Sequence, residues 1–194
     1  MNRGERTLYR SKKFDIIGKG ETEGIRTKWD SILILPFTSD DRGFPLMLGV
    51  IEEKNEFREG GYSASVISGS PEDEDYDTLT TAKRELSEET GFDVKEEERW
   101  YFIGTLTGTK FVDSVHPCFA VDVSGITPSE PKTDGSEQEK LSKFRFINSN
   151  EVVYLEDPFI PSMFLRIFKY VVGMDIYNRE DSIFSRKKEI NTEI

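Results

Sequence analysis

The sequence has one cysteine, no long apolar run and no cluster of basic residues. Cys118 alone cannot form an intrachain disulfide or a multi-cysteine zinc site, which is typical of a chain from a reducing compartment. The N-terminal stretch lacks an apolar segment, so we expect neither a signal peptide nor a membrane anchor. The most apolar later stretch, 159–172, is too short to span a bilayer and carries two basic residues. We therefore expect a cytoplasmic protein with no membrane partner.

Basic residues are outnumbered, with 26 Lys and Arg against 37 Asp and Glu, for a formal net charge of -11. Nucleic-acid backbones are held mainly by clustered Lys and Arg, so a nucleic-acid partner is not expected. An acidic chain favours metal cations instead. The 194 residues include 14 Phe, which indicates one globular domain with an aromatic-rich core and room for a small appendage.

The chain divides into three predicted parts. Residues 1–28 mix short apolar pairs with glycines and predict a small β appendage. Residues 29–172 carry the main domain, and the charged segment 173–194 is expected to be a C-terminal tail. Apolar runs of strand length predict five main-domain strands, within 29–37, 45–53, 100–108, 116–123 and 143–147, and a further strand is expected within 61–70.

Two helices are predicted in the main domain. The first runs from about Thr78 to Thr90 and is closed by Gly91, after a strand and a glycine-containing loop. The second begins at Asp157 and Pro158, and its apolar residues recur with helical spacing through 171. We interpret its aromatic stripe as a core-packing face.

The first helix concentrates negative charge. At about 100° per residue, Glu85, Glu88 and Glu89 fall within an arc of roughly 100°, while Leu86 belongs to an adjacent apolar face. A solvated acidic face with Arg84 as counterion is one interpretation. The other is a metal site, because carboxylates converging from one rigid face suit Mg²⁺ or Mn²⁺.

Gly69 and the run from 84 to 92, RELSEETGF, together resemble the Nudix box. The downstream half matches the pattern Arg-Glu-hydrophobe-any-Glu-Glu-any-Gly-hydrophobe at every defined position. The upstream half departs from it, because fourteen residues separate Gly69 from Arg84 where the family has thirteen. The place of the first motif glutamate falls on Asp75 or on Tyr76, depending on the direction of counting, and Asp75 or Asp77 is expected to substitute.

The resemblance implies an α+β fold, an α/β/α sandwich with a mixed β-sheet between helices. It also implies Mg²⁺-dependent (or Mn²⁺-dependent) hydrolysis of a nucleoside diphosphate derivative. Carried over, the resemblance makes Glu88 and Glu89 metal ligands, Glu85 a ligand or base, and Arg84 their orienting partner. The carbonyl of Ser68 would also face a metal.

A late loop often supplies the general base in this family. Here Glu137 and Glu139 are the candidates, and Glu139 is our choice. His116 has no triad partner visible in the sequence and is interpreted as structural.

The early β segment and the stretch NEFREGGY resemble the ADP-ribose pyrophosphatase branch, whose members often dimerise through the N-terminal segment. A small-molecule nucleotide substrate and a homodimer are therefore expected. The proline that this branch carries some fifteen residues past the box is missing. Arg58 could contact a diphosphate, and Phe57, Tyr62 or Phe111 could stack on a base. A nucleotide sensor without activity and an RNA 5′-end pyrophosphohydrolase are the alternative functions.

Overall fold

The structure is a computed structural model that describes residues 5–28, 31–55, 61–132 and 142–170. Within these ranges the α-helices are α1 (Thr78–Thr90) and α2 (Phe159–Tyr170), and 3₁₀ helices cover Glu97–Arg99 and Ser149–Tyr154. The strands are β1 (Arg6–Arg10), β2 (Phe14–Lys19), β3 (Thr22–Thr27), β4 (Ile32–Ser39), β5 (Pro45–Lys54), β6 (Tyr62–Ser65), β7 (Ile67–Gly69), β8 (Trp100–Thr107), β9 (Val112–Asp113), β10 (Val115–Asp122) and β11 (Lys143–Asn148).

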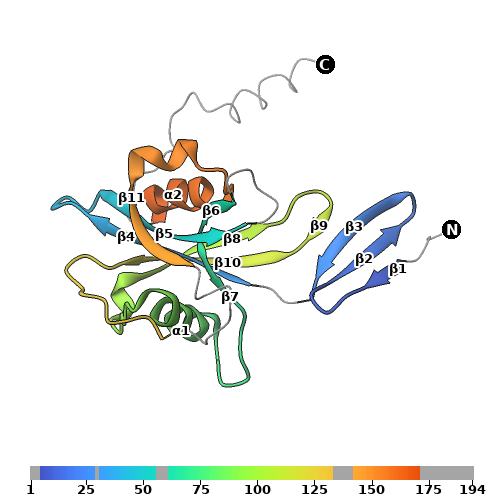
Figure 1. Ribbon diagram of the computed structural model, residues 1–194, viewed down its shortest axis with the longest axis horizontal. Coiled ribbons are helices and arrows are strands. Elements are labelled where there is room, and N and C mark those ends of the chain that lie inside the picture. The colour runs from blue at the N-terminus through green and yellow to red at the C-terminus, as the bar shows by residue number, and fades with distance from the viewer. Residues whose placement is uncertain (1–4, 29–30, 56–60, 133–141, 171–194) are drawn as a thin grey trace, which may run out of the picture.

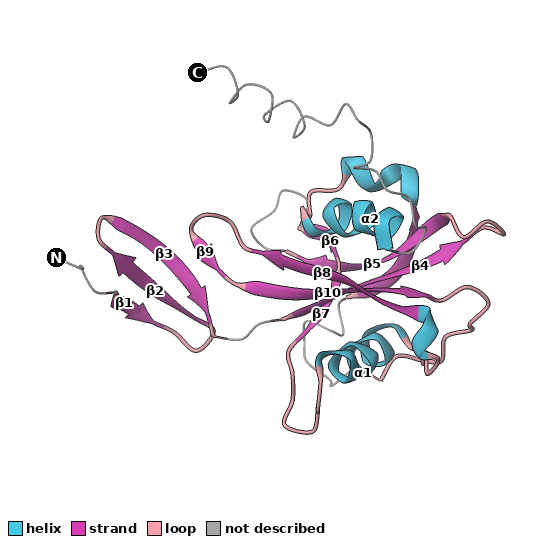
Figure 2. Ribbon diagram, turned by 180° about the vertical axis from the view of Figure 1, so that it is seen from behind, coloured by secondary structure: helices cyan, strands magenta, loops and turns pink. Residues whose placement is uncertain are grey.

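The main sheet lies between the two α-helices, with α2 on one face and α1 on the other (Figure 1, Figure 2). Its path is β11-β5-β4-β10-β8, with β6 paired to β5 and β7 paired to β4. The sheet is mixed, because β4 and β10 run parallel while β4 and β5 run antiparallel. The predicted α/β/α sandwich with a mixed sheet is confirmed.

The sheet is buried on both faces at β4, and this explains its unbroken apolar run. Leu33, Leu35 and Phe37 pack into the cluster that includes the α2 residues. Ile32 and Ile34 point the other way, into the cluster that includes the α1 residues. A central strand covered by helices on both sides has no polar face, so apolar residues do not alternate with polar ones.

The two neighbouring strands β4 and β5 pair only at one end. Phe37 and Thr38 pair with Leu48 and Met47, whereas the first half of β4 pairs with β7 and the last part of β5 pairs with β6. The strands therefore diverge, and the short β6 and β7 bridge the gap between them. This divergence leaves room for the cavity described below.

Both predicted helices are confirmed, and the first has the predicted bounds. The carboxylate of Asp77 accepts a hydrogen bond from the Thr80 amide at 2.7 Å and so caps the start of α1. Gly91 ends the helix with a φ of 77°, a left-handed conformation that favours glycine. Within the described ranges, neither α1 nor α2 is long and apolar enough to cross a membrane.

The predicted β appendage forms a second sheet of four strands, in the order β1-β2-β3-β9. Its last strand comes from the connection between β8 and β10, so the main domain itself completes this sheet (Figure 1). The sequence did not reveal this pairing. The boundary at residues 28 and 29 stays a prediction, and the tail at 173–194 lies outside the described residues.

Candidate active site

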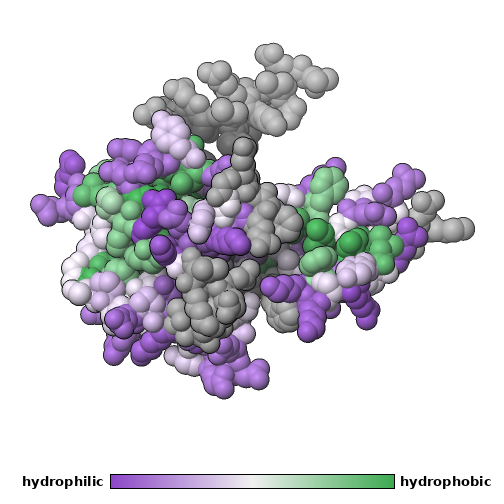
Figure 3. All heavy atoms as spheres, in the orientation of Figure 1, coloured by the Kyte–Doolittle hydropathy of each residue, from purple (hydrophilic) through white to green (hydrophobic). Residues whose placement is uncertain are grey.

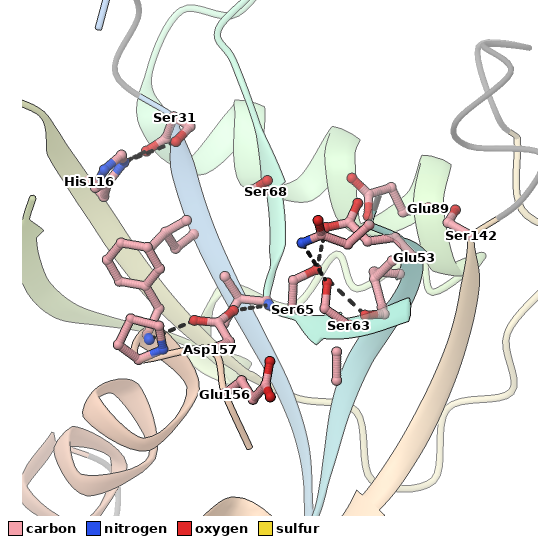
Figure 4. A pocket seen from close by; sticks show the side chains of 17 residues that line it. Ser31, Glu53, Ser63, Ser65, Ser68, Glu89, His116, Ser142, Glu156 and Asp157 are labelled. Atoms are coloured by element: carbon pink, nitrogen blue, oxygen red, sulfur yellow. Dashed lines mark hydrogen bonds between the residues drawn. The ribbon is translucent and has the colours of Figure 1, made fainter. Parts of the chain in front are cut away.

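A cavity of about 490 Å³ opens between the diverging strands and the start of α2 (Figure 4). Its wall includes the ends of β4 and β5, the β6 and β7 bridge, and one glutamate from α1. The residues that line it are Ser31, Leu33, Ile51, Glu53, Asn55, Ser63, Ala64, Ser65, Val66, Ser68, Glu89, His116, Ser142, Glu156, Asp157, Pro158 and Phe159. Most of the polar side chains in the wall are therefore those of serine, glutamate and aspartate.

Helix α1 presents its carboxylates because its other face is in the core. Ala82 and Leu86 have no exposed surface, and they anchor the helix against the sheet. Glu85, Glu88 and Glu89 lie on the remaining face, as their spacing predicted. Of these, Glu89 reaches the cavity wall.

Arg84 gathers the carboxylates next to this helix face. Its Nη1 lies 2.9 Å from Oε1 of Glu85 and 2.9 Å from Oε2 of Glu88. Its Nη2 donates to Oδ2 of Asp75 at 3.0 Å and to the carbonyl of Ser70 at 2.9 Å. Burial opposes the charge on Arg84, but the bond to Asp75 and the nearby glutamates outweigh it and raise its pKa above the ordinary value.

Asp75 occupies the position opposite Arg84 that the altered motif left open. Its side chain is only 4% exposed, and it also accepts a hydrogen bond from the Glu72 amide at 3.0 Å. Burial works to raise the pKa of Asp75, but the bonds from Arg84 and Glu72 hold it below its usual value. Asp77 instead caps the helix, and Tyr76 is 86% exposed. Of the two aspartates, Asp75 is the one that contacts Arg84.

Replacing Asp75 with asparagine is expected to destabilise the fold by about 1–3 kcal/mol, because it removes the most buried charged partner of a largely buried guanidinium. Urea unfolding in a chelating buffer measures the loss. Asp73→Asn is the matched control, since Asp73 is exposed in the same loop. Equal unfolding free energies for the two variants would contradict the bracing role of Asp75.

The side chain of Glu85 is 13% exposed, whereas that of Glu88 is 35% exposed. Burial raises the pKa of Glu85 to about 7, although Arg84 acts in the opposite direction. The carboxylate packs directly on Gly69, where a Cβ atom would lie 1.8 Å from Cδ of Glu85. Only glycine leaves space for Glu85 in this position.

The raised pKa of Glu85 predicts that the metal-free protein loses stability as the pH rises. Between pH 4.5, the ordinary pKa of a glutamate, and pH 7, Glu85 holds a proton in the folded state but not in the unfolded state. The stabilisation that results is therefore complete below pH 4.5 and is lost as the pH rises through about 7. Its full size is about 3 kcal/mol. Urea unfolding at pH 5 to 8 in chelator should show this decline in the wild type relative to Glu85→Gln. Parallel curves for the two proteins would count against the prediction.

The side-chain atoms near α1 that could bind a metal ion are all oxygen atoms, and oxygen ligands suit Mg²⁺ or Mn²⁺ better than a soft metal. In the described ranges, no group of three or more His, Cys, Asp or Glu side chains is arranged to hold a metal ion. The reason is visible in the geometry, because Glu85 and Glu88 both turn to the same nitrogen of Arg84. The donor set fits a divalent cation, provided that these carboxylates turn from Arg84 toward it.

The predicted site residues fall into four groups. Arg84, Glu85 and Glu88 are in contact, while Ser68 and Glu89 line the cavity. Four other predicted residues, Arg58, Phe57, Glu137 and Glu139, lie outside the described residues. Tyr62 and Phe111 are described but do not line this cavity; Phe111 lines a separate cavity of about 400 Å³ beside β3.

Asp157 and His116 are among the cavity-wall residues that were not assigned to the site from the sequence. Asp157 was expected only as a helix start, yet it accepts hydrogen bonds from the amides of Val66 at 3.1 Å and Phe159 at 2.7 Å. It thereby ties the β6 and β7 bridge to α2, and burial raises its pKa. His116 was interpreted as structural, and it lies at the cavity wall. No local pattern assigns either residue to the cavity, because Asp157 reaches Val66 across 91 positions and His116 reaches Ser31 across 85.

Comparisons with known proteins agree with this arrangement. A family model described as NUDIX domain matches residues 28–166. A crystal structure titled as an ADP compounds hydrolase superposes with a TM-score of 0.62, at 18% sequence identity, over 86% of this chain and 90% of that chain. At this identity the likeness shows the fold. No curated protein matches the sequence.

Proposed function

The chain belongs to the NUDIX family and is a pyrophosphohydrolase of that type, and from this premise we propose that it hydrolyses ADP-ribose or a similar nucleoside diphosphate derivative. One observation carries the proposal. A single helix face brings Arg84, Glu85 and Glu88 into contact and extends Glu89 into a cavity of about 490 Å³. A volume of this size suits a nucleotide-sized ligand.

The residues of α1 would hold the metal that this chemistry uses. Glu88 and Glu89 would be its carboxylate ligands, Glu85 a further ligand or the base, and the carbonyl of Ser68 an additional donor. When bound, Mg²⁺ or Mn²⁺ neutralises charge on the phosphoryl oxygens and lowers the pKa of water. Arg84 positions Glu85 and Glu88, since both lie 2.9 Å from its Nη1.

In the proposed reaction, water adds to one phosphorus and the bridging P–O bond breaks. ADP-ribose then yields AMP and ribose 5-phosphate, with the proton of the attacking water passing to a base. We propose Glu139 as that base and Arg58 as a contact to the diphosphate. The structural neighbour titled as an ADP compounds hydrolase supports an ADP-containing substrate.

Product analysis by liquid chromatography tests the proposal directly. The purified protein would be incubated with Mg²⁺ or Mn²⁺ and with ADP-ribose, NADH, FAD, UDP-glucose or nucleoside triphosphates. AMP and ribose 5-phosphate from ADP-ribose are the expected products. Cleavage of another compound alone would overturn the substrate but keep the chemistry, whereas binding without cleavage of any compound would favour the nucleotide sensor.

We also propose that the protein forms a homodimer through the appendage sheet and works in the cytoplasm. Hydrophobic residues, coloured green, lie at the surface of this lobe among hydrophilic ones, at the right of Figure 3. Large side chains are exposed there, with Tyr9 at 56%, Leu8 at 42% and Ile25 at 39%. An uncovered apolar sheet of this kind favours association with a second copy. Light scattering coupled to size exclusion should give twice the chain mass of 22.3 kDa, and a monomer would refute the proposal.

A further inference from the structure

The cavity has a second end, away from the glutamates. In Figure 4, Glu89 and Ser142 lie at one side, His116 and Ser31 lie at the opposite side, and Ser68 lies between them. The ring of Phe159 packs against His116, with centroids 5.4 Å apart and planes at 67°. Pro158 lines the cavity next to Phe159. Two ring systems and a proline therefore form one wall, which we call the aromatic wall.

The ring of His116 is held at both nitrogens. Nδ1 lies 3.1 Å from the carbonyl oxygen of Ser31 and 2.9 Å from its hydroxyl. Nε2 lies 2.9 Å from the hydroxyl oxygen of Ser114. With both nitrogens bound to protein groups, His116 offers a ligand its ring surface and not a free donor or acceptor.

Phe159 is held just as firmly at the first turn of α2. Its amide donates to Asp157 at 2.7 Å, and its side chain packs against the core cluster that includes Ile160 and Met163. The aromatic wall therefore keeps its shape without a ligand. Rigid ring surfaces at one end of a polar cavity suit a flat, uncharged ring system, which stacks on aromatic groups with little loss of entropy.

We propose that the aromatic wall of His116 and Phe159 binds the nucleobase of the substrate. This inference rests on the proposed function, in which the base is the planar group of the substrate and the diphosphate lies toward Ser68 and Glu89. The serines on β6 face the cavity from the other wall. Their hydroxyls suit the sugar part of such a compound, so the two walls take different parts of it.

Calorimetric titration of the full chain, in buffer with Mg²⁺, tests the wall with AMP and ribose 5-phosphate as separate probes. His116→Ala is expected to weaken AMP binding about tenfold, the usual size for loss of one base-stacking partner. Phe159→Leu keeps an apolar side chain but removes the ring, and it should weaken AMP binding severalfold. Neither variant should change the affinity for ribose 5-phosphate by more than about twofold.

Phe164→Leu is the matched control, because Phe164 lies on the same helix and packs against the same core cluster but does not line the cavity. It should leave AMP binding unchanged. Thermal unfolding of every variant identifies any loss of AMP affinity that comes from misfolding. If His116→Ala proves unstable, His116→Phe, which restores a ring, should bind AMP as the wild type does.

The inference is overturned if wild-type protein does not bind AMP, if the variants bind it as the wild type does, or if both probes weaken equally. ADP-ribose cleavage measured in parallel separates the two proposals. Cleavage with unchanged AMP affinities would remove the base site and keep the function. A selective loss of AMP affinity without wild-type cleavage would keep the base site and remove the proposed substrate.

Discussion

Replacing Glu89 with glutamine is expected to slow diphosphate cleavage by more than about a hundredfold, which exceeds the usual loss from an outer-shell partner of a metal ligand. The amide keeps the size of the side chain but removes the charge that a divalent cation requires. Glu89 is the glutamate of α1 that lines the cavity, so its loss acts where the substrate would bind.

The rate should be measured at saturating Mg²⁺ with ADP-ribose, or with whichever compound the wild type cleaves. Glu98→Gln is the matched control, because Glu98 is exposed on the 3₁₀ helix after α1. This substitution makes the same change in net charge as Glu89→Gln. A rate for Glu89→Gln close to that of Glu98→Gln would remove Glu89 from the proposed ligand set.

Substituting alanine for Gly69 is expected to slow diphosphate cleavage by about a hundredfold as well, since a displacement of about 1 Å at a reacting site can lower the rate by this factor. The added Cβ would lie 1.8 Å from Cδ of Glu85, far inside contact distance. Gly69 does not have a positive φ, so alanine suits the backbone and the conflict is steric. Glu85 must therefore move, and its contact with Arg84 at 2.9 Å is lost.

A double-mutant cycle separates this conflict from a general loss of stability. Gly69→Ala, Glu85→Ala and the double variant would be compared by urea unfolding. Removing the Glu85 side chain relieves the clash, so the double variant should be more stable than the sum of the single effects predicts, by about 1 kcal/mol or more. Additive effects would show that Gly69 and Glu85 do not constrain each other.

The sequence was sufficient for the features that depend on local patterns. The bounds of α1 follow from Asp77, the apolar spacing and Gly91, all within fifteen residues. The double-sided burial of β4 likewise follows from its unbroken apolar run. Glu85, Glu88 and Glu89 share a face because helical geometry requires it.

The remaining features depend on distant contacts that no local pattern encodes. Asp75 was distinguished from Asp77 only when the loop placed it against Arg84. The predicted strand within 61–70 is divided into β6 and β7, and the Val66 amide between them bonds Asp157, which lies 91 positions later. His116 likewise reaches Ser31 across 85 positions. Such pairings are set by tertiary packing, so they could not be predicted from spacing.

The pairing of β3 with β9 has a consequence for how the chain acquires its structure during synthesis. The first three strands are complete at Thr27, but their fourth partner begins at Val112. At typical elongation rates this interval lasts roughly 4 to 17 seconds. Throughout it, the edge of β3 is open to other nascent chains. Translation speed across residues 28–112 therefore bears on the yield of correctly assembled protein, independently of the final stability.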